Sequence, residues 1–215
     1  MNDTIEIREQ VIEDTAAEVI LAAIQNRRSI GRVTDEVPSR ELIERVLEAG
    51  RWAPSHHLTE PWRFFVLSGE ARKALGVVMG DVAAAGIDDP EGRLVAYERA
   101  VGKPLRAPYL VAVAVEPAVA PNVFEVEEIA SGAAAAQNML LAAHALGLAA
   151  MWRTGAVCYE PAMRRFFGLS ERATVLGFLY VGFPAMPAPI RERRALGEVV
   201  TWMDGAAVPG SRTGA

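Results

Sequence analysis

Two short segments of this chain carry side chains suited to chemistry at a bound ligand. The first is the cluster Arg27-Arg28-Ser29, where guanidinium groups and a hydroxyl could bind a phosphate through several hydrogen bonds. The same cations could instead interact with the negative C-terminal end of the helix expected just before them. The chain has no P-loop and no G-x-G-x-x-G motif opening a helix after a strand. The common nucleotide-binding motifs therefore do not choose between these two roles.

The second segment is the loop 53–62, which holds His56 and His57 close to Glu60. Histidine and carboxylate side chains are ordinary metal ligands, and a neutral imidazole can also act as a general base. The H-E-x-x-H spacing of helical zinc sites is absent, and so is the G-x-S-x-G motif of one large class of hydrolases. On residue types alone, the loop fits a metal site, a general base or a polar turn held between prolines.

The composition limits what kind of protein these segments belong to. The chain has 215 residues, 51% of them hydrophobic, and its 22 Lys and Arg against 27 Asp and Glu give a net charge of −5. We expect a folded domain with a substantial core, and the acidic balance argues against a general nucleic-acid binder. The single cysteine, Cys158, excludes an internal disulfide and a multi-cysteine metal site. Since the N-terminal residues lack the apolar region of a signal peptide, we expect a cytoplasmic protein.

A stretch without charged residues runs from Ile129 to Trp152 and is long enough to suggest a membrane span. Gln137, Asn138 and His144 interrupt it, so we expect a buried helix and no association with a membrane. A helix that is apolar on nearly every side has to be covered on every side. In a chain of this size a second subunit can provide that cover, and the stretch therefore also predicts a homodimer.

Hydrophobic periodicity and turn residues divide the chain into helices and strands that alternate unevenly. The expected helices cover 15–26, 39–50 with Ser39 as N-cap, 69–80, 123–146 and 161–167. The expected strands cover 61–68, 109–115, 148–152, 175–183 and 198–202. Residues 81–103 are expected to form an irregular acidic connection with helical pieces. The order predicts one α+β domain at 15–203, between a flexible N-terminal arm at 1–14 and a C-terminal tail at 204–215.

Five motifs along the chain are informative as an ordered set. They are Arg27-Arg28-Ser29, Ala53-Pro54-Ser55 leading to Pro61-Trp62-Arg63-Phe64, Ala136-Gln137-Asn138-Met139-Leu140, Trp152-Arg153-Thr154-Gly155 and Gly177-Phe178-Leu179-Tyr180-Val181-Gly182-Phe183-Pro184. In this order and spacing the sequence resembles the FMN-dependent nitroreductase family over about residues 17–203, and most closely the compact branch with a Trp-Arg-Ser-Gly signature. The resemblance implies a three-layer α+β sandwich with a central mixed β-sheet, built as an intertwined homodimer.

The resemblance also implies a function and a set of site residues. The family transfers a hydride from NAD(P)H through flavin N5 to nitroaromatic compounds, quinones or related small-molecule acceptors, and FMN lies at the subunit interface. The residues that match the family's flavin contacts within one subunit are Arg27, Arg28, Ser29, Trp152, Arg153 and Thr154. Trp52 and His56 would approach the flavin from the other subunit. One of Arg191, Arg193 and Arg194 resembles a basic residue that reaches the FMN phosphate, although a solvated basic arm explains these three equally well.

The loop 53–62 departs from the family pattern Pro-Ser-x-x-Asn-x-Gln-Pro-Trp at two positions. Leu58 replaces an asparagine and Glu60 replaces a glutamine. Leucine offers no hydrogen bond and an ionised glutamate only accepts, so the contact with the polar edge of a flavin would change. These departures favour, as an alternative, a protein that binds or sequesters flavin with little turnover. A hydrolase without flavin, using His56 or His57, is a third possibility.

Overall fold

A four-stranded antiparallel sheet forms the centre of the computed structural model, which describes residues 14–188 and 190–203. The strand order is β1-β2-β4-β3. The strands are β1 (Trp62–Leu67), β2 (Tyr109–Val115), β3 (Ala149–Arg153) and β4 (Thr174–Gly182). Within the described residues, parallel pairing occurs as the isolated bridge between Ser29 and Ala150, so the mixed character expected of the sheet is confined to this bridge.

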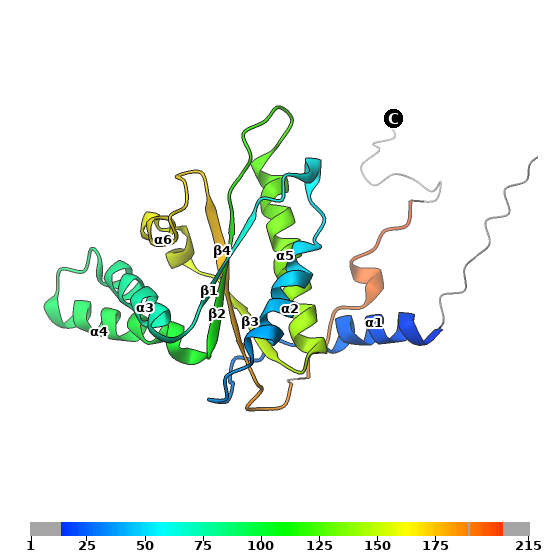
Figure 1. Ribbon diagram of the computed structural model, residues 1–215, viewed down its shortest axis with the longest axis horizontal. Helices are drawn as coiled ribbons and strands as arrows, with labels where there is room; N and C mark the ends of the chain where they lie inside the picture. The colour runs from blue at the N-terminus through cyan, green and yellow to red at the C-terminus, as the bar shows by residue number, and fades with distance from the viewer. Residues whose placement is uncertain (1–13, 189, 204–215) are drawn as a thin grey trace, which may run out of the picture.

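Helices cover both faces of the sheet, which gives the expected three layers of an α+β sandwich (Figure 1). One face carries α2 (Arg40–Arg51) and α5 (Glu125–Ala145), and the other carries α3 (Gly69–Ala84), α4 (Pro90–Val101) and α6 (Pro161–Phe167). The first helix, α1 (Asp14–Asn26), extends away from this body (Figure 1). None of the described helices is both long enough and apolar enough to cross a bilayer.

The apolar run of β2 is divided between two cores because successive side chains of a strand point to opposite faces. Val111, Val113 and Val115 pack in the core beneath α2 and α5. Leu110, Ala112 and Ala114 pack in the core beneath α3 and α6. This central strand is buried on both faces, as its continuous hydrophobicity predicts.

Most of the expected elements are confirmed within a few residues. Ser39 caps α2, where its Oγ accepts a hydrogen bond from the backbone N–H of Leu42 at 3.3 Å. The helical pieces expected within 81–103 are confirmed, but the segment is less irregular than expected, because α3 continues to Ala84 and α4 covers most of the remaining residues. Asp89 is the N-cap of α4 and Pro90 lies in its first turn. Both residue types are typical of a helix start, so the sequence contains the signal for this helix.

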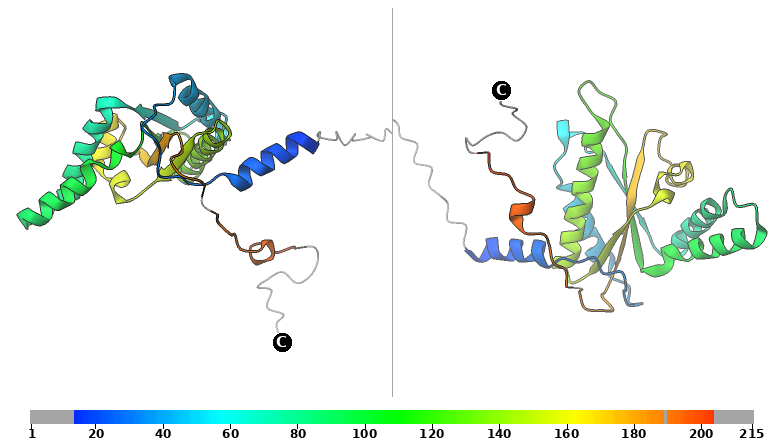
Figure 2. Two further views of the ribbon diagram at one scale, coloured as in Figure 1. Left: turned by 90° about the horizontal axis from the view of Figure 1, so that it is seen from below. Right: turned by 180° about the vertical axis from the view of Figure 1, so that it is seen from behind.

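The C-terminal segment 190–203 lies away from the body of the molecule, as does α1 (Figure 2). The strand expected at 198–202 is wrong: this segment contains the short 3-10 helix η4 (Leu196–Glu198) and is otherwise irregular. A β-strand requires a neighbouring strand, and the described part of this chain provides none beside the projecting segment. The arm predicted at 1–14, except Asp14, and the tail predicted at 204–215 lie outside the described residues.

Candidate functional site

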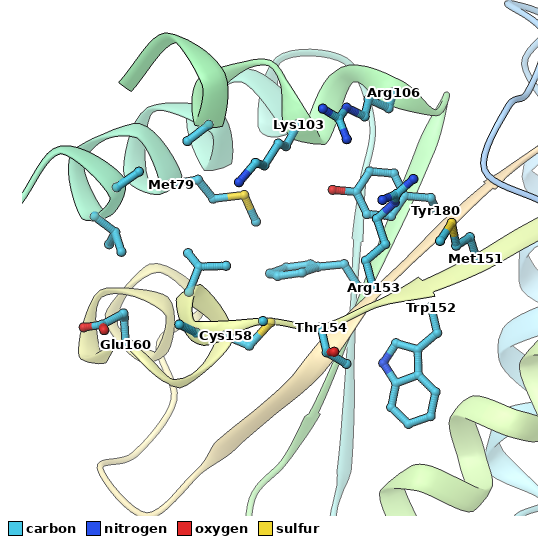
Figure 3. Close-up of a pocket in the computed structure, with 17 residues that line it drawn as sticks. Met79, Lys103, Arg106, Met151, Trp152, Arg153, Thr154, Cys158, Glu160 and Tyr180 are labelled. Atoms are coloured by element: carbon cyan, nitrogen blue, oxygen red, sulfur yellow. The ribbon is translucent and has the colours of Figure 1, made fainter. Parts of the chain in front are cut away.

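A cavity of about 690 Å³ opens between the end of β3, the helix α3 and the turn that follows α4 (Figure 3). Three cations line it: Lys103 and Arg106 from the 3-10 helix η2 (Lys103–Arg106) and Arg153 from β3. Tyr180 of β4 points its hydroxyl into the space, and Met79 of α3 reaches it from the opposite wall. With one carboxylate, Glu160, against these three cations, the cavity combines apolar walls with an excess of positive charge, which suits an aromatic ligand that carries negative charge.

The alternation of β3 decides which of its side chains reach this cavity. Arg153 points into the cavity, whereas the indole of Trp152 lies on the opposite side of the strand (Figure 3). Trp152 Nε1 donates a hydrogen bond to the carbonyl oxygen of Leu176 at 3.2 Å, and the ring packs beside the core under α5. Trp152 can therefore meet a ligand in the cavity mainly through its backbone. Thr154, which follows β3, also lines the cavity.

Pairing between Ser29 and Ala150 places the basic cluster 27–29 beside the start of β3. The backbone N–H of Ile30 donates to the carbonyl of Ala150 at 3.3 Å. At Gly31 the segment comes so close to β3 that an added Cβ would lie 2.9 Å from the sulfur of Met151 and 3.0 Å from Arg153 Nη2. The cluster does not itself line the cavity, but it lies next to β3, the strand that carries Arg153, and Arg153 does line the cavity.

Three guanidinium groups at this site keep a buried nitrogen without a partner in the described chain. They are Arg27 through Nη1, Arg28 through Nε and Arg153 through Nε. Buried polar groups in folded proteins are almost always hydrogen-bonded, so these unpaired cationic donors on and next to β3 indicate a place for an anionic acceptor. The Arg153 guanidinium is otherwise held over the ring of Tyr180, 5.3 Å from its centroid.

Arg28 combines the two roles that the sequence leaves open for the basic cluster. Its Nη1 donates to the backbone carbonyls of Gln25 and Arg27, at the C-terminal end of α1. This is the helix-end interaction expected of a cation there. Its Nε remains unpaired, and Arg27 makes no comparable contact through Nη1. Of the two side chains, Arg27 is therefore the freer to bind an anion.

The loop containing the two histidines has a strained backbone. His57, Leu58 and Glu60 have φ angles of 52°, 55° and 47°, in the left-handed region that costs residues other than glycine about 1 kcal/mol each. The strain is held by hydrogen bonds within the loop, including one of 2.9 Å from the Glu60 backbone N–H to Ser55 Oγ. Leu58 is 84% exposed at the tip.

Two glutamates of α5 anchor this loop, and neither is among the residues that the sequence motifs identify. Glu127 Oε2 lies 3.2 Å from His56 Nε2, and the completely buried Glu128 accepts a hydrogen bond from Thr59. The sequence signal for them is a pair of acids immediately before the long uncharged stretch, where the expected helix must bury one of its faces. Among the described residues, no three His, Cys, Asp or Glu side chains gather as a metal site requires.

The remaining predicted site residues lie away from the cavity of their own chain. Trp52, at the end of α2, is 75% exposed and donates from Nε1 to Glu48 at 2.9 Å. His56 lies beside the first turn of α5. Arg191, Arg193 and Arg194 are exposed on the projecting C-terminal segment. Conversely, Lys103 and Arg106 line the cavity although no sequence motif marks them.

Two groups in the cavity wall have raised pKa values. Burial raises the pKa of the Tyr180 hydroxyl, and the nearby positive charge of Arg153 partly opposes this effect. Burial also raises the pKa of the Cys158 thiol, which is only 1% exposed. Both groups hold their protons more tightly in the folded protein than in the unfolded chain. Their contribution to stability is therefore complete below about pH 8 and is lost as the pH rises through the two raised pKa values.

We expect Cys158 to be unreactive in the folded protein. At pH 8 a chromogenic aromatic disulfide should modify it at least about 100-fold more slowly than in denatured protein, because the thiolate is disfavoured and the sulfur is buried. Modification is followed by absorbance, with the same protein in guanidinium chloride as the control. Equal rates in the two conditions would show that the thiol is accessible.

Comparison with known proteins agrees with the fold. The family model described as the nitroreductase family matches residues 24–183, which is most of the chain. This chain belongs to the nitroreductase family. It is 36% identical over 169 residues to YdjA of Escherichia coli strain K12, which carries a provisional name as an NAD(P)H nitroreductase; the match covers 78% of this chain and 90% of YdjA.

Solved structures of nitroreductases have the same architecture. A nitroreductase-like family protein from Bacillus cereus superposes with a TM-score of 0.74 at 26% identity, covering 86% of this chain and 96% of that one. A nitroreductase with bound FMN from Bacteroides fragilis gives a TM-score of 0.67 at 27% identity, covering 86% of this chain and 98% of that one. The three-layer sandwich expected from the sequence is therefore the nitroreductase fold.

Proposed function

We propose that this protein binds FMN in the cavity beside β3 and is an oxidoreductase that uses NAD(P)H to reduce small conjugated acceptors. The observation that carries the proposal is the unpaired guanidinium nitrogen of Arg153 in the cavity wall, together with those of Arg27 and Arg28 on the segment that pairs with β3. FMN offers what these residues lack, a phosphate that only accepts hydrogen bonds and a planar ring system. The FMN-bound relative from Bacteroides fragilis supports the same choice.

The protein side of this chemistry is binding, orientation and electrostatics. When bound, FMN supplies the hydride chemistry between NAD(P)H and an acceptor such as a nitroaromatic compound or a quinone. Arg27, with Arg28 and Ser29, would bind the phosphate. Lys103 and Arg153 would place positive charge next to the ring, which stabilises an electron-rich ligand.

We also propose that the working form is a homodimer. Both elements that project from the body expose large apolar side chains, among them Val19 at 69% and Trp202 at 81%. Helix α5 also exposes the apolar Ala130 and Ala145, together with the polar Gln137. Monomeric proteins rarely leave so much apolar surface in water. A second copy would cover these surfaces and could bring Trp52 and His56 of one subunit to the cavity of the other.

Steady-state turnover separates an enzyme from a flavin-binding protein. With FMN bound, we expect continuous oxidation of NADPH or NADH when a nitrofuran or a quinone is added, followed by the loss of nicotinamide absorbance. A protein that retains FMN but oxidises neither nicotinamide would be a flavin carrier, as the exposed and apolar Leu58 would favour. A protein that does not retain FMN would refute both proposals.

Glu60 is expected to lower the reduction potential of the bound flavin, because reduced FMN is anionic and a nearby negative charge opposes reduction. Replacing Glu60 with Gln should raise the two-electron potential by about 10–20 mV, the size expected of one exposed charge near the ring. The potential is measured by spectroscopic redox titration. The control Glu171→Gln removes the same charge at the turn before β4 and should leave the potential unchanged. Equal potentials in Glu60→Gln and the wild type would exclude this effect.

A further inference from the structure

Glu128 holds the strained loop 55–60 through a buried connection that the flavin chemistry itself does not use. Its side chain is completely buried on α5. Glu128 Oε1 accepts a hydrogen bond from Thr59 Oγ1 at 2.5 Å, and Oε2 accepts one from the backbone N–H of Ala118 at 3.1 Å. Burying a carboxylate is unfavourable unless its oxygens are hydrogen-bonded, so both contacts are needed to keep this group inside the protein.

Thr59 is the point where this buried group meets the loop. Its hydroxyl is 2.5 Å from Glu128 and 3.4 Å from Ser55 Oγ, and Ser55 Oγ in turn accepts the backbone N–H of Glu60. The residues around Thr59 have left-handed backbone angles that their side chains disfavour. A loop of this kind keeps one conformation only when its surroundings impose it. Glu128 lies on helix α5 inside the core, and its hydrogen bond with Thr59 is one of the contacts that impose this conformation.

The anchored loop presents its side chains outward. Leu58 is 84% exposed, and His56 lies at the surface with its Nε2 3.2 Å from Glu127. A surface loop that is strained, firmly anchored and tipped with an exposed leucine is typical of a binding element rather than a simple connection. In this chain the loop is also on a different side of the molecule from the cavity lined by Arg153.

We infer that Glu128 is a positioning residue for the flavin site. Through Thr59 it fixes the loop so that His56 and Leu58 are presented in one geometry to the cavity of the second subunit. This inference rests on the proposed binding of FMN by a homodimer. Neither Glu128 nor Thr59 is a catalytic residue in it, because neither touches the cofactor.

Variants of Thr59 test the connection without leaving a charge unpaired in the core. Thr59→Val keeps the shape of the side chain and removes the hydroxyl, whereas Thr59→Ser keeps the hydroxyl. We expect Thr59→Val to weaken FMN binding by about tenfold and Thr59→Ser to bind within about twofold of the wild type. Affinity is measured by fluorescence titration of flavin-free protein. Ser131→Ala is the matched control: it removes a buried hydroxyl one turn further along α5, bonded locally to the carbonyl of Glu127, and should bind FMN normally.

Hydrogen exchange in the flavin-free protein supplies a second readout. The backbone amide of Glu60 should exchange faster in Thr59→Val than in the wild type, and that of Ala118 should exchange faster in Glu128→Gln. If Thr59 and Glu128 act as one unit, the double variant should bind FMN no more weakly than the weaker single variant. Wild-type affinity in Thr59→Val would overturn the inference. A wild-type protein that does not bind FMN would instead refute the proposed function, and unchanged exchange would separately refute the anchoring.

Discussion

Replacing Arg27 with methionine is expected to weaken FMN binding by about 100-fold. A charge-assisted hydrogen bond to phosphate contributes about 1.5–3 kcal/mol, and each 1.4 kcal/mol changes an affinity tenfold. Without ligand, Arg27 Nη1 is buried and has no partner in the described chain, so removing the guanidinium costs the flavin-free protein no hydrogen bond at that atom. We therefore expect the melting temperature of the flavin-free protein to stay the same or to rise while the affinity falls.

Weaker FMN binding together with an unchanged or higher melting temperature distinguishes a ligand-binding arginine from a structural one. The control Arg40→Met removes an exposed arginine whose side chain is paired with Glu44 on the surface of α2, so it changes the net charge equally. It should leave the FMN dissociation constant unchanged. Affinity is measured by fluorescence titration and stability by thermal denaturation. An Arg27→Met protein that binds FMN within threefold of the wild type, or that loses stability without flavin, would remove Arg27 from the proposed phosphate site.

Replacing Gly177 with alanine is expected to destabilise the protein by about 3 kcal/mol, through overpacking and an unfavourable backbone angle. Gly177 has a φ angle of 142° at the point where the pairing of β2 with β4 shifts register. A Cβ there would lie 2.5 Å from Trp152 Nε1 and 2.6 Å from the carbonyl oxygen of Arg153. Those atoms belong to the strand that lines the cavity, so we expect weaker FMN binding as well.

Thermal denaturation measures the stability effect, which should lower the melting temperature by about 6–12 °C for a chain of this length. Gly102→Ala is the matched control, because Gly102 has a φ angle of −81° and no atom within 4 Å of an added Cβ. It should change stability by less than about 0.5 kcal/mol. A melting temperature for Gly177→Ala equal to that of the control would show that the strands adjust without cost.

Most of the fold can be predicted from the sequence, because the patterns that indicate its helices and strands are local. The alternation of β2 between two cores, the Ser39 cap and the apolar character of α5 follow from neighbouring residues. The sequence predicts only helical pieces where α4 forms, because α4 is weakly amphipathic, although Asp89 and Pro90 mark its start. The strand expected at 198–202 is wrong because a strand depends on a partner distant in the sequence. These apolar residues have no neighbouring strand in the described part of their own chain.

The site can be predicted less completely, because its residues come from segments that are far apart in the sequence. Arg153 and Thr154 could be predicted from their motif, but Lys103 and Arg106 meet them through the packing of α3 against α4 and η2, which joins segments far apart in the sequence. The indole of Trp152 faces away from the cavity because the alternation of β3 sends it there, a direction that the motif alone does not specify. Glu128 is identified by a hydrogen bond to Thr59, a residue far away in the sequence.

The most direct test of the proposed function is the visible spectrum of the protein loaded with FMN, recorded before and after NADPH or NADH is added without oxygen. If the guanidinium groups beside β3 hold a flavin that receives a hydride, the protein will stay yellow through gel filtration and lose its flavin absorbance when one of the nicotinamides is added. A colourless protein after gel filtration would contradict the binding site. A yellow protein whose spectrum neither nicotinamide changes would contradict the oxidoreductase.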